Sequence, residues 1–204
     1  MPRPLLIAAT LLLVLAGVAR PAGAQSPAEA PAQTKTFGII GGVDFATLAG
    51  SDVSNTSSRT GFMGGLFLGV MVGRSVEVEP EVLYSMKGSS FTDSDTTLAL
   101  DYIEVPILVK LHLQPEGGMY LLAGPAADFH VSCKAVGAIT IDCADFGLSP
   151  NLTFGGIVGL GYTRGRVGVE GRYDFDFSDA LALDQFTNLN AKNRVWAILA
   201  RVSL

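Results

Sequence analysis

Residues 166–177, RVGVEGRYDFDF, alternate between two kinds of side chain. Acids and one base occupy positions 170, 172, 174 and 176, and mostly aliphatic and aromatic residues stand between them. A period of two is typical of a β-strand, because successive side chains point to opposite faces. The segment therefore predicts a strand with one charged and one apolar face, and the fold depends on which face is the interior.

Seven further segments show this alternation or are rich in strand-forming residues. The eight expected strands are about 36–46, 60–73, 75–87, 98–113, 118–131, 151–163, 166–177 and 194–204. Most are long enough for a tilted membrane crossing, which takes about 9–11 residues.

The connections between these strands alternate in length. The short ones are 73–75, 113–118 and 163–166, and the long polar ones are 47–59, 88–97, 132–150 and 178–193. This alternation is typical of outer-membrane barrels, which have short periplasmic turns and longer outer loops. An even number of strands would place both ends of the barrel on the periplasmic side.

The composition indicates which face of the strands is the interior. Hydrophobic residues make up 49% and charged residues only 16%, yet no apolar segment after residue 24 approaches the length of a spanning helix. Strands can cross lipid only as a closed barrel, with apolar side chains outside and polar ones inside. The sequence therefore predicts an all-β fold, an eight-stranded antiparallel up-and-down transmembrane β-barrel. A soluble periplasmic barrel that holds an apolar ligand is the alternative.

The N-terminal segment has the pattern of a secretory signal. Arg3 precedes an apolar run, Leu5–Ala19, and small residues precede Gln25. The run has about 15 residues, whereas an anchoring helix needs about 20. We expect a signal peptide at 1–24 with cleavage near Ala24, a flexible Pro- and Ala-rich linker at 25–35, and the barrel at 36–204.

The charged residues of the strands share the face that we expect to line the lumen. The predicted luminal charge network is Glu77, Glu79, Glu81, Glu104, Lys110, Glu170, Arg172, Asp174 and Arg201, with Asp44, Asp128 and Asp176 on the same face. If acids face bases across neighbouring strands, Glu77 should lie opposite Lys110 and Glu170 opposite Arg201. Eight strands leave a lumen that side chains fill, so we expect a salt-bridged plug rather than a porin-like pore.

Aromatic residues gather near the ends of the expected strands. The predicted membrane girdle is Tyr120, Tyr162, Tyr173, Phe175, Phe177 and Trp196. Tyrosine and tryptophan are enriched at membrane–water interfaces because their rings are amphipathic.

Residues 101–129, DYIEVPILVKLHLQPEGGMYLLAGPAADF, resemble the outer-membrane β-barrel family that includes PorT-like proteins. The matching residues are Tyr102, Glu104, Pro106, Lys110, Tyr120 and the Gly124-Pro125 pair. The resemblance implies an eight-stranded barrel in the outer membrane and no catalytic residues. The chain ends in Leu204 where many such barrels end in Phe, but the apolar face that includes Trp196 still resembles the signal read by the assembly machinery.

Cys133 and Cys143 are the only cysteines, and both lie in the third long connection. In an exported chain such a pair predicts a disulfide, worth about 2.5–3 kcal/mol on the chain-entropy model. A metal site with His130 is the alternative, but it lacks a fourth ligand.

Two other groups of residues have types suited to catalysis or metal binding. His130 and Ser132 would share a face of a continuing strand, as in some outer-membrane lipid hydrolases, but Glu170 should lie near the other end of the barrel. Asp174 and Asp176 with loop acids such as Asp179 and Asp184 lack a 12-residue calcium loop. We therefore predict no enzymatic activity, no cofactor and no metal.

The expected role is structural, or recognition and adhesion at the cell surface through the four long connections. A narrow channel for ions or small solutes, with weak cation preference, is the alternative. The net charge is −5, and −7 without residues 1–24 (12 basic against 19 acidic residues), which argues against nucleic-acid binding. Expected partners are outer-membrane lipids, the assembly machinery during insertion and an extracellular partner. The expected location is the outer membrane of a Gram-negative-type cell envelope.

Overall fold

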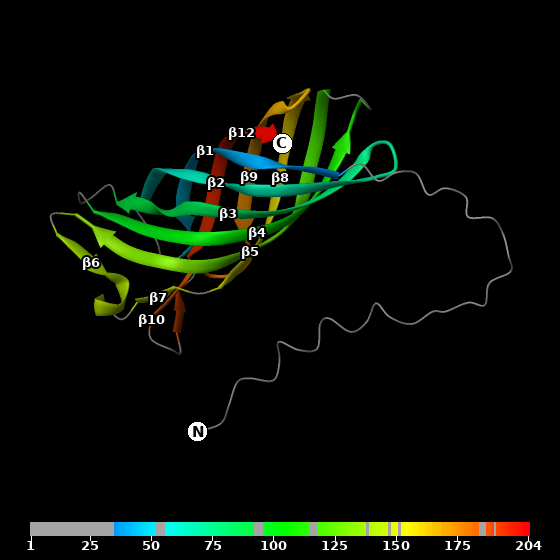
Figure 1. The fold of residues 1–204 in the computed structure, drawn as a ribbon. Coiled ribbons are helices and arrows are strands. Elements are labelled where there is room, and N and C mark those ends of the chain that lie inside the picture. Colours follow the sequence, from blue (N-terminus) through cyan, green and yellow to red (C-terminus); the bar gives the residue numbers. More distant parts are fainter. Residues whose placement is uncertain are drawn as a thin grey trace, which may run out of the picture. The chain divides into compact units, whose positions relative to one another are not determined.

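The computed structural model describes residues 35–51, 56–91, 96–114, 118–137, 139–146, 148–150, 152–183, 187–189 and 191–204. The expected signal peptide and nearly all of the expected linker lie outside these residues. The described residues form a β-barrel (Figure 1).

Eight long strands form the barrel wall. They are β1 (Lys35–Ala49), β2 (Thr56–Val72), β3 (Val76–Phe91), β4 (Thr97–His112), β5 (Gly118–Val136), β8 (Thr153–Arg164), β9 (Val167–Asp176) and β12 (Lys192–Ser203). Each pairs antiparallel with the next, and β1 also pairs with β12, so the sheet closes on itself. The eight-stranded antiparallel barrel expected from the sequence is confirmed.

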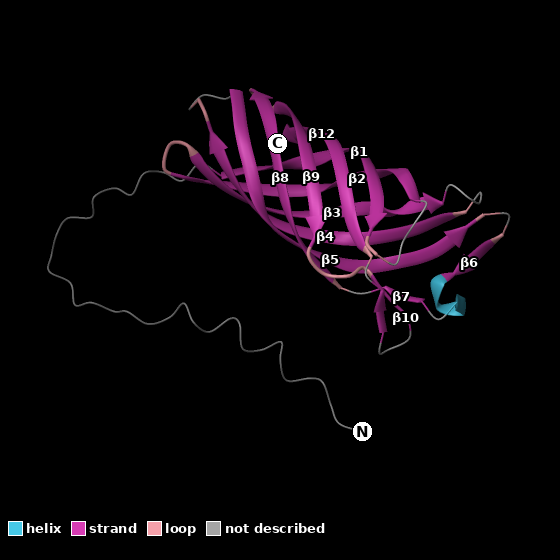
Figure 2. Ribbon diagram, turned by 180° about the vertical axis from the view of Figure 1, so that it is seen from behind, coloured by secondary structure: helices cyan, strands magenta, loops and turns pink. Residues whose placement is uncertain are grey.

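The long connections carry additional short elements. These are β6 (Thr140–Asp142), the 3₁₀ turn η1 (Cys143–Phe146), β7 (Leu148–Pro150), β10 (Leu181–Leu183) and β11 (Thr187–Leu189). β6 pairs with the end of β5, while β10 lies between β7 and β11 in a separate three-stranded sheet. Figure 2 shows β6, η1, β7 and β10 at one end of the barrel, away from the C-terminus. The third and fourth long connections are therefore partly folded.

Both ends of the wall lie on the side of the short turns. The backbone amide of Leu204 donates to the carbonyl of Phe37 at 2.8 Å, so the last residue lies beside the start of β1. The turns at this end include Gly73 and Gly165, with φ of 84° and 62°. Glycine suits these turns because left-handed backbone is strained for other residues.

Charged side chains lie in the interior, between clusters of buried apolar residues, and apolar side chains cover the outer wall. Glu79, Lys110 and Arg172 are buried, whereas Val82, Ile107 and many other apolar residues are about half exposed. The strand that includes residues 170–176 turns its acids inward and its aromatics outward. The alternative of a soluble barrel with an apolar lumen is therefore wrong. Among the described residues, no helix is long and apolar enough to cross a membrane.

Candidate functional site

Glu170 on β9 lies at the centre of an inner charged layer. Its carboxylate accepts hydrogen bonds from Lys110 Nζ at 2.7 Å, Arg201 Nη1 at 2.7 Å and Arg172 Nε at 2.8 Å. The Tyr120 hydroxyl donates a fourth at 2.6 Å. These donors come from β4, β12, β9 and β5, so one carboxylate connects four strands.

Glutamates of β3 complete the layer from across the lumen. Glu79 pairs with Lys110 at 2.5 Å and with Arg201 at 2.6 Å. Glu81 receives two parallel hydrogen bonds, both 2.7 Å, from Arg172. Such bidentate pairs are among the stronger charge-assisted hydrogen bonds.

Glu77 lies at the inner edge of this layer, where it contacts His112 at 2.7 Å. The inner charged layer is thus defined as Glu77, Glu79, Glu81, Lys110, Glu170, Arg172 and Arg201. Short contacts join three of its acids, Glu79, Glu81 and Glu170, to its three bases, so these charges largely compensate one another. The layer forms a salt-bridged plug at the end of the lumen that carries the short turns.

A second charged layer lies nearer the outer loops. Lys87 Nζ is 2.8 Å from Glu104 Oε2 and 2.6 Å from Asp128 Oδ2. The other acids are Asp44, Asp174 and Asp176, all buried. We name Asp44, Lys87, Glu104, Asp128, Asp174 and Asp176 the acidic layer. The sequence reasoning missed Lys87, although its odd number places it on the same face as Glu77, Glu79 and Glu81.

The order of layers can be followed along β4. Its buried inward residues from the outer end are Leu98, Leu100, Tyr102, Glu104, Pro106, Leu108 and Lys110. The first three belong to an apolar cluster, defined as the outer cap, of Leu48, Leu98, Leu100, Tyr102, Cys133, Cys143, Ala180 and Ala191. Leu108 belongs to another apolar cluster, with Tyr120, Leu122, Ala126 and Ile157. The acidic layer therefore lies between apolar groups.

The two predicted cross-strand pairs have different outcomes. Glu77 lies opposite Lys110 as predicted, but Lys110 pairs with Glu79 and Glu170 instead. Glu170 lies opposite Leu199, and Arg201 opposite Gly168, so that predicted register was wrong by two residues. Arg201 still reaches Glu170 at 2.7 Å because its long side chain spans the diagonal. The narrow lumen lets charges pair across the barrel as well as between neighbours.

The expected aromatic girdle is partly on the outer wall. Tyr162, Phe177 and Trp196 are 48%, 63% and 63% exposed. The Tyr173 ring packs against the Trp196 ring, with centroids 4.6 Å apart. The Phe175 ring stacks on the Tyr173 ring, with centroids 5.9 Å apart.

The expected position of Tyr120 on the outer wall was wrong, because this side chain faces the lumen. It is 1% exposed and binds Glu170. Opposite it on β8 is Gly161, whose missing side chain leaves space for the Tyr120 ring.

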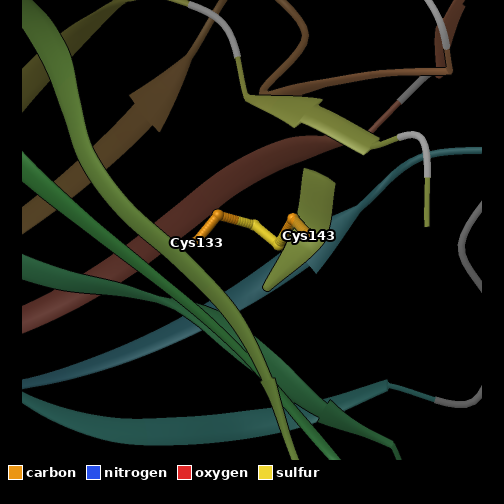
Figure 3. Close-up of a disulfide and its surroundings, with 2 residues drawn as sticks. All are labelled: Cys133 and Cys143. Carbon is orange, nitrogen blue, oxygen red and sulfur yellow. A yellow bond between two sulfur atoms is a disulfide. The ribbon is translucent and has the colours of Figure 1, made fainter. Parts of the chain in front are cut away.

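The third long connection is fastened to the barrel by a disulfide. Cys133 on β5 and Cys143 on η1 are bonded, with Cα atoms 5.5 Å apart (Figure 3). Both belong to the outer cap, together with residues of β1, β4 and the fourth connection. The disulfide predicted from the spacing is present and holds η1 over the barrel mouth.

The expectation that His130 and Ser132 share a face was wrong. An irregularity in the β4–β5 ladder pairs Asp101 with Ser132 but Tyr102 with His130, which leaves Val131 as an extra residue. A bulge of this kind changes which face the following side chains occupy. His130 packs edge-on against the inward Tyr102, while Ser132 lies beside the outward Asp101.

Comparison with known proteins agrees with this architecture. A family model described as outer membrane protein β-barrel domain matches residues 24–182. The chain belongs to this family. Membership of an outer-membrane family supports location in the outer membrane, and the exposed apolar side chains of the barrel wall suit contact with lipid. Comparison with curated protein sequences found no significant match.

Two solved structures show the same fold as this outer membrane β-barrel protein. Neisserial surface protein A is 14% identical, with a TM-score of 0.53, over 82% of this chain and 97% of that protein. Ail, the attachment invasion locus protein of Yersinia pestis, is 12% identical, with a TM-score of 0.52, over 83% and 98%. At these identities the likeness concerns the fold alone.

Proposed function

We propose that this outer-membrane barrel serves recognition or adhesion at the cell surface through its outer connections, without catalysis. The observation that carries the proposal is that these connections fold. β6, η1, β7, β10 and β11 lie there, and the Cys133–Cys143 disulfide ties η1 to the wall. A pre-ordered surface binds with a smaller entropic cost than mobile loops do.

The charge of the outer connections indicates the chemistry of the partner. Their acids are Asp52, Asp93, Asp95, Asp142, Asp145, Asp179 and Asp184, and their bases are Arg59, Lys134 and Lys192. A set of outer connections whose sequence carries seven acids and three bases favours a neutral or basic partner. Ail has been solved with the heparin analogue sucrose octasulfate, a polyanion, and such a ligand would be repelled here.

Binding of whole cells tests this proposal. Bacteria that express the full chain are applied to wells coated with collagen, mannan or heparin. We expect retention on collagen or mannan and none on heparin. Retention on heparin alone, or on no surface, would contradict the proposal.

Exposed apolar residues at the two ends of the barrel provide a matched pair of variants. Ile139, 71% exposed near β6, is changed to Ser, and Leu113, 56% exposed beside the inner turn, is changed to Ser as the control. We expect Ile139→Ser to reduce retention and Leu113→Ser to leave it unchanged. Equal effects of both would contradict a role for the outer end.

The channel alternative has less support because two charged layers and three apolar clusters occupy the lumen. We expect the purified protein to give no conductance above background in planar bilayers. Stable cation-selective steps would favour the channel, since the lumen holds more acids than bases.

We place the chain near the PorT-like branch of the family, on the residues of the 101–129 segment. We also expect signal cleavage after Ala24, recognition of the last strand by the assembly machinery and contact with outer-membrane lipids. N-terminal sequencing of the protein from an outer-membrane fraction tests the cleavage site, and a start other than Gln25 would move it.

A further inference from the structure

We propose that the acidic layer binds a small divalent cation in the outer half of the barrel. The layer consists of Asp44, Lys87, Glu104, Asp128, Asp174 and Asp176, none more than 5% exposed. This inference goes beyond surface recognition, because the site lies beneath the outer cap rather than on the loops.

The charges of the acidic layer do not balance. Lys87 is its only base, and its ammonium group contacts Glu104 and Asp128. The nearest other luminal guanidinium on β9, that of Arg172, is turned toward Glu81 and Glu170. Five carboxylates thus share one ammonium group among the described residues.

Arg59 on β2 interacts electrostatically with Asp44 but supplies only part of the missing charge. It lies 3.7 Å from Asp101 and donates a hydrogen bond to the backbone carbonyl of Lys87. Asp101 is not a member of the layer, because it occupies the outward face of β4. Arg59 is therefore engaged at the edge of the layer rather than within it.

Asp174 provides an independent indication of a ligand. It is 3% exposed, and neither of its carboxylate oxygens has a hydrogen-bond partner within the described part of the chain. Oδ1 of Asp128 also lacks one. Asp174 interacts electrostatically with the bases Lys87 and Arg172 and with the like-charged Asp128 and Asp176. An ionised carboxylate is costly to bury without a partner, so a bound cation would relieve both the charge and the missing contacts.

The ligand chemistry selects the cation. Carboxylate oxygens are hard ligands that suit Mg²⁺ or Ca²⁺ better than softer metals. Within the described residues, no three His, Cys, Asp or Glu side chains already form a metal site. A cation that keeps several waters and takes only one or two carboxylates, as Mg²⁺ commonly does, fits such a layer. This site was not expected from the sequence, which predicted no metal.

A cation can reach the acidic layer of the folded barrel only with difficulty. The outer cap covers the layer on one side and the inner charged layer closes the other, so the cation is expected to enter as the barrel folds. The full chain is refolded from urea into zwitterionic detergent with MgCl₂, with KCl at equal ionic strength, or with EDTA. The readout is the temperature at which resistance to SDS is lost on a gel.

We expect Mg²⁺ to raise this midpoint by about 5 °C over KCl. Asp174→Asn should abolish the Mg²⁺-dependent increase and raise the midpoint in EDTA, because it removes an unpaired charge. Asp145→Asn, an exposed acid on η1, should keep the increase. No increase in the wild type, or an equal one in Asp174→Asn, would overturn the proposal.

Direct binding keeps the proposal testable if Asp174→Asn does not refold. Equilibrium dialysis of the refolded wild type should find about one tightly held Mg²⁺ per chain, consistent with a single layer of carboxylates. Asp176→Asn then replaces Asp174→Asn and should lower that occupancy. A wild type that holds no Mg²⁺ after dialysis would overturn the proposal.

Discussion

At the scale of single residues, Glu170 has the largest structural role in the lumen. It is 1% exposed and joins three bases and Tyr120. Removal of one partner from a buried ion pair leaves its former partners uncompensated, and this cost exceeds the net value of the pair. Single substitutions in the inner charged layer should therefore affect stability more than any surface change.

Glu170→Gln should lower the free energy of unfolding by about 3 kcal/mol, because an amide removes the negative charge that faces three bases. The measurement is urea unfolding of the protein in lipid vesicles. Asp145→Asn is the control, with an expected change within about 0.5 kcal/mol. Equal stability of Glu170→Gln and the wild type would show that the ion pairs do not hold the layer together.

The double variant Glu170→Arg/Arg201→Glu exchanges the two charges, and we expect it to recover little of the stability that the two single changes remove. The pair is close, but an arginine at position 170 would also face Lys110 and Arg172. The double variant is therefore expected to remain near the sum of the two single changes. A recovery of more than about 1.5 kcal/mol would show that the pair acts alone.

Two glycines offer a matched pair of substitutions. A Cβ at Gly161 would collide with the Tyr120 ring, whereas a Cβ at Gly171 would have no neighbouring atom within 4 Å. Gly161→Ala should cost about 1–3 kcal/mol by displacing Tyr120 from Glu170. Gly171→Ala should change stability by less than about 0.5 kcal/mol. Similar results for both in urea unfolding would contradict the lumenal packing of Tyr120.

At the scale of elements, the alternation with a period of two predicted the strands of the barrel wall. One face of each strand needs apolar side chains toward lipid and the other needs polar side chains toward the lumen. The eight expected strands all have counterparts, and most of these extend further at the outer end. The three-residue strands β7, β10 and β11 were not predicted. β7 pairs with β10 of another connection that is distant in sequence, and the hairpin of β10 with β11 joins only three residue pairs, too few for a recognisable alternation. The bulge at Val131, which changes the face that the following side chains occupy, was not predicted because a bulge leaves no clear sequence pattern.

The Cys133–Cys143 disulfide should stabilise the outer end rather than the wall. Serine at both positions should cost about 2.5–3 kcal/mol, the chain-entropy value for so small a loop. We expect faster proteolysis between residues 134 and 150 while resistance to SDS is kept. Unchanged proteolysis would mean that the outer cap holds η1 without the covalent bond.

At the scale of the whole molecule, the polarity of the barrel was predictable and the pairing of its interior was not. The position of each luminal charge follows from strand parity, whereas its partner depends on side chains that meet across the lumen, such as Arg172 and Glu81. Tyr120 was misplaced for the same reason. An aromatic near a turn resembles an interfacial anchor until the facing Gly161 is known.

Trp196 reports on the polarity of the whole barrel because it is the only tryptophan in the chain. It is 63% exposed on the outer wall. In vesicles its fluorescence should be quenched by brominated lipids and protected from aqueous iodide, because membrane barrels turn aromatic residues to lipid near the interfaces. Quenching by iodide alone would place Trp196 in water and contradict the membrane assignment.

The pairing of β1 with β12 determines when the protein can finish folding. Twelve residue pairs join strands from opposite ends of the described chain, from Gly38↔Ser203 to Ala49↔Lys192. Until the last strand arrives, two edges stay open, and open edges invite aggregation and cannot be left in lipid. The barrel can therefore close only when the chain has been made through to its last strand. A prematurely terminated product would fail at the final step, remain in the periplasm and be available to proteases.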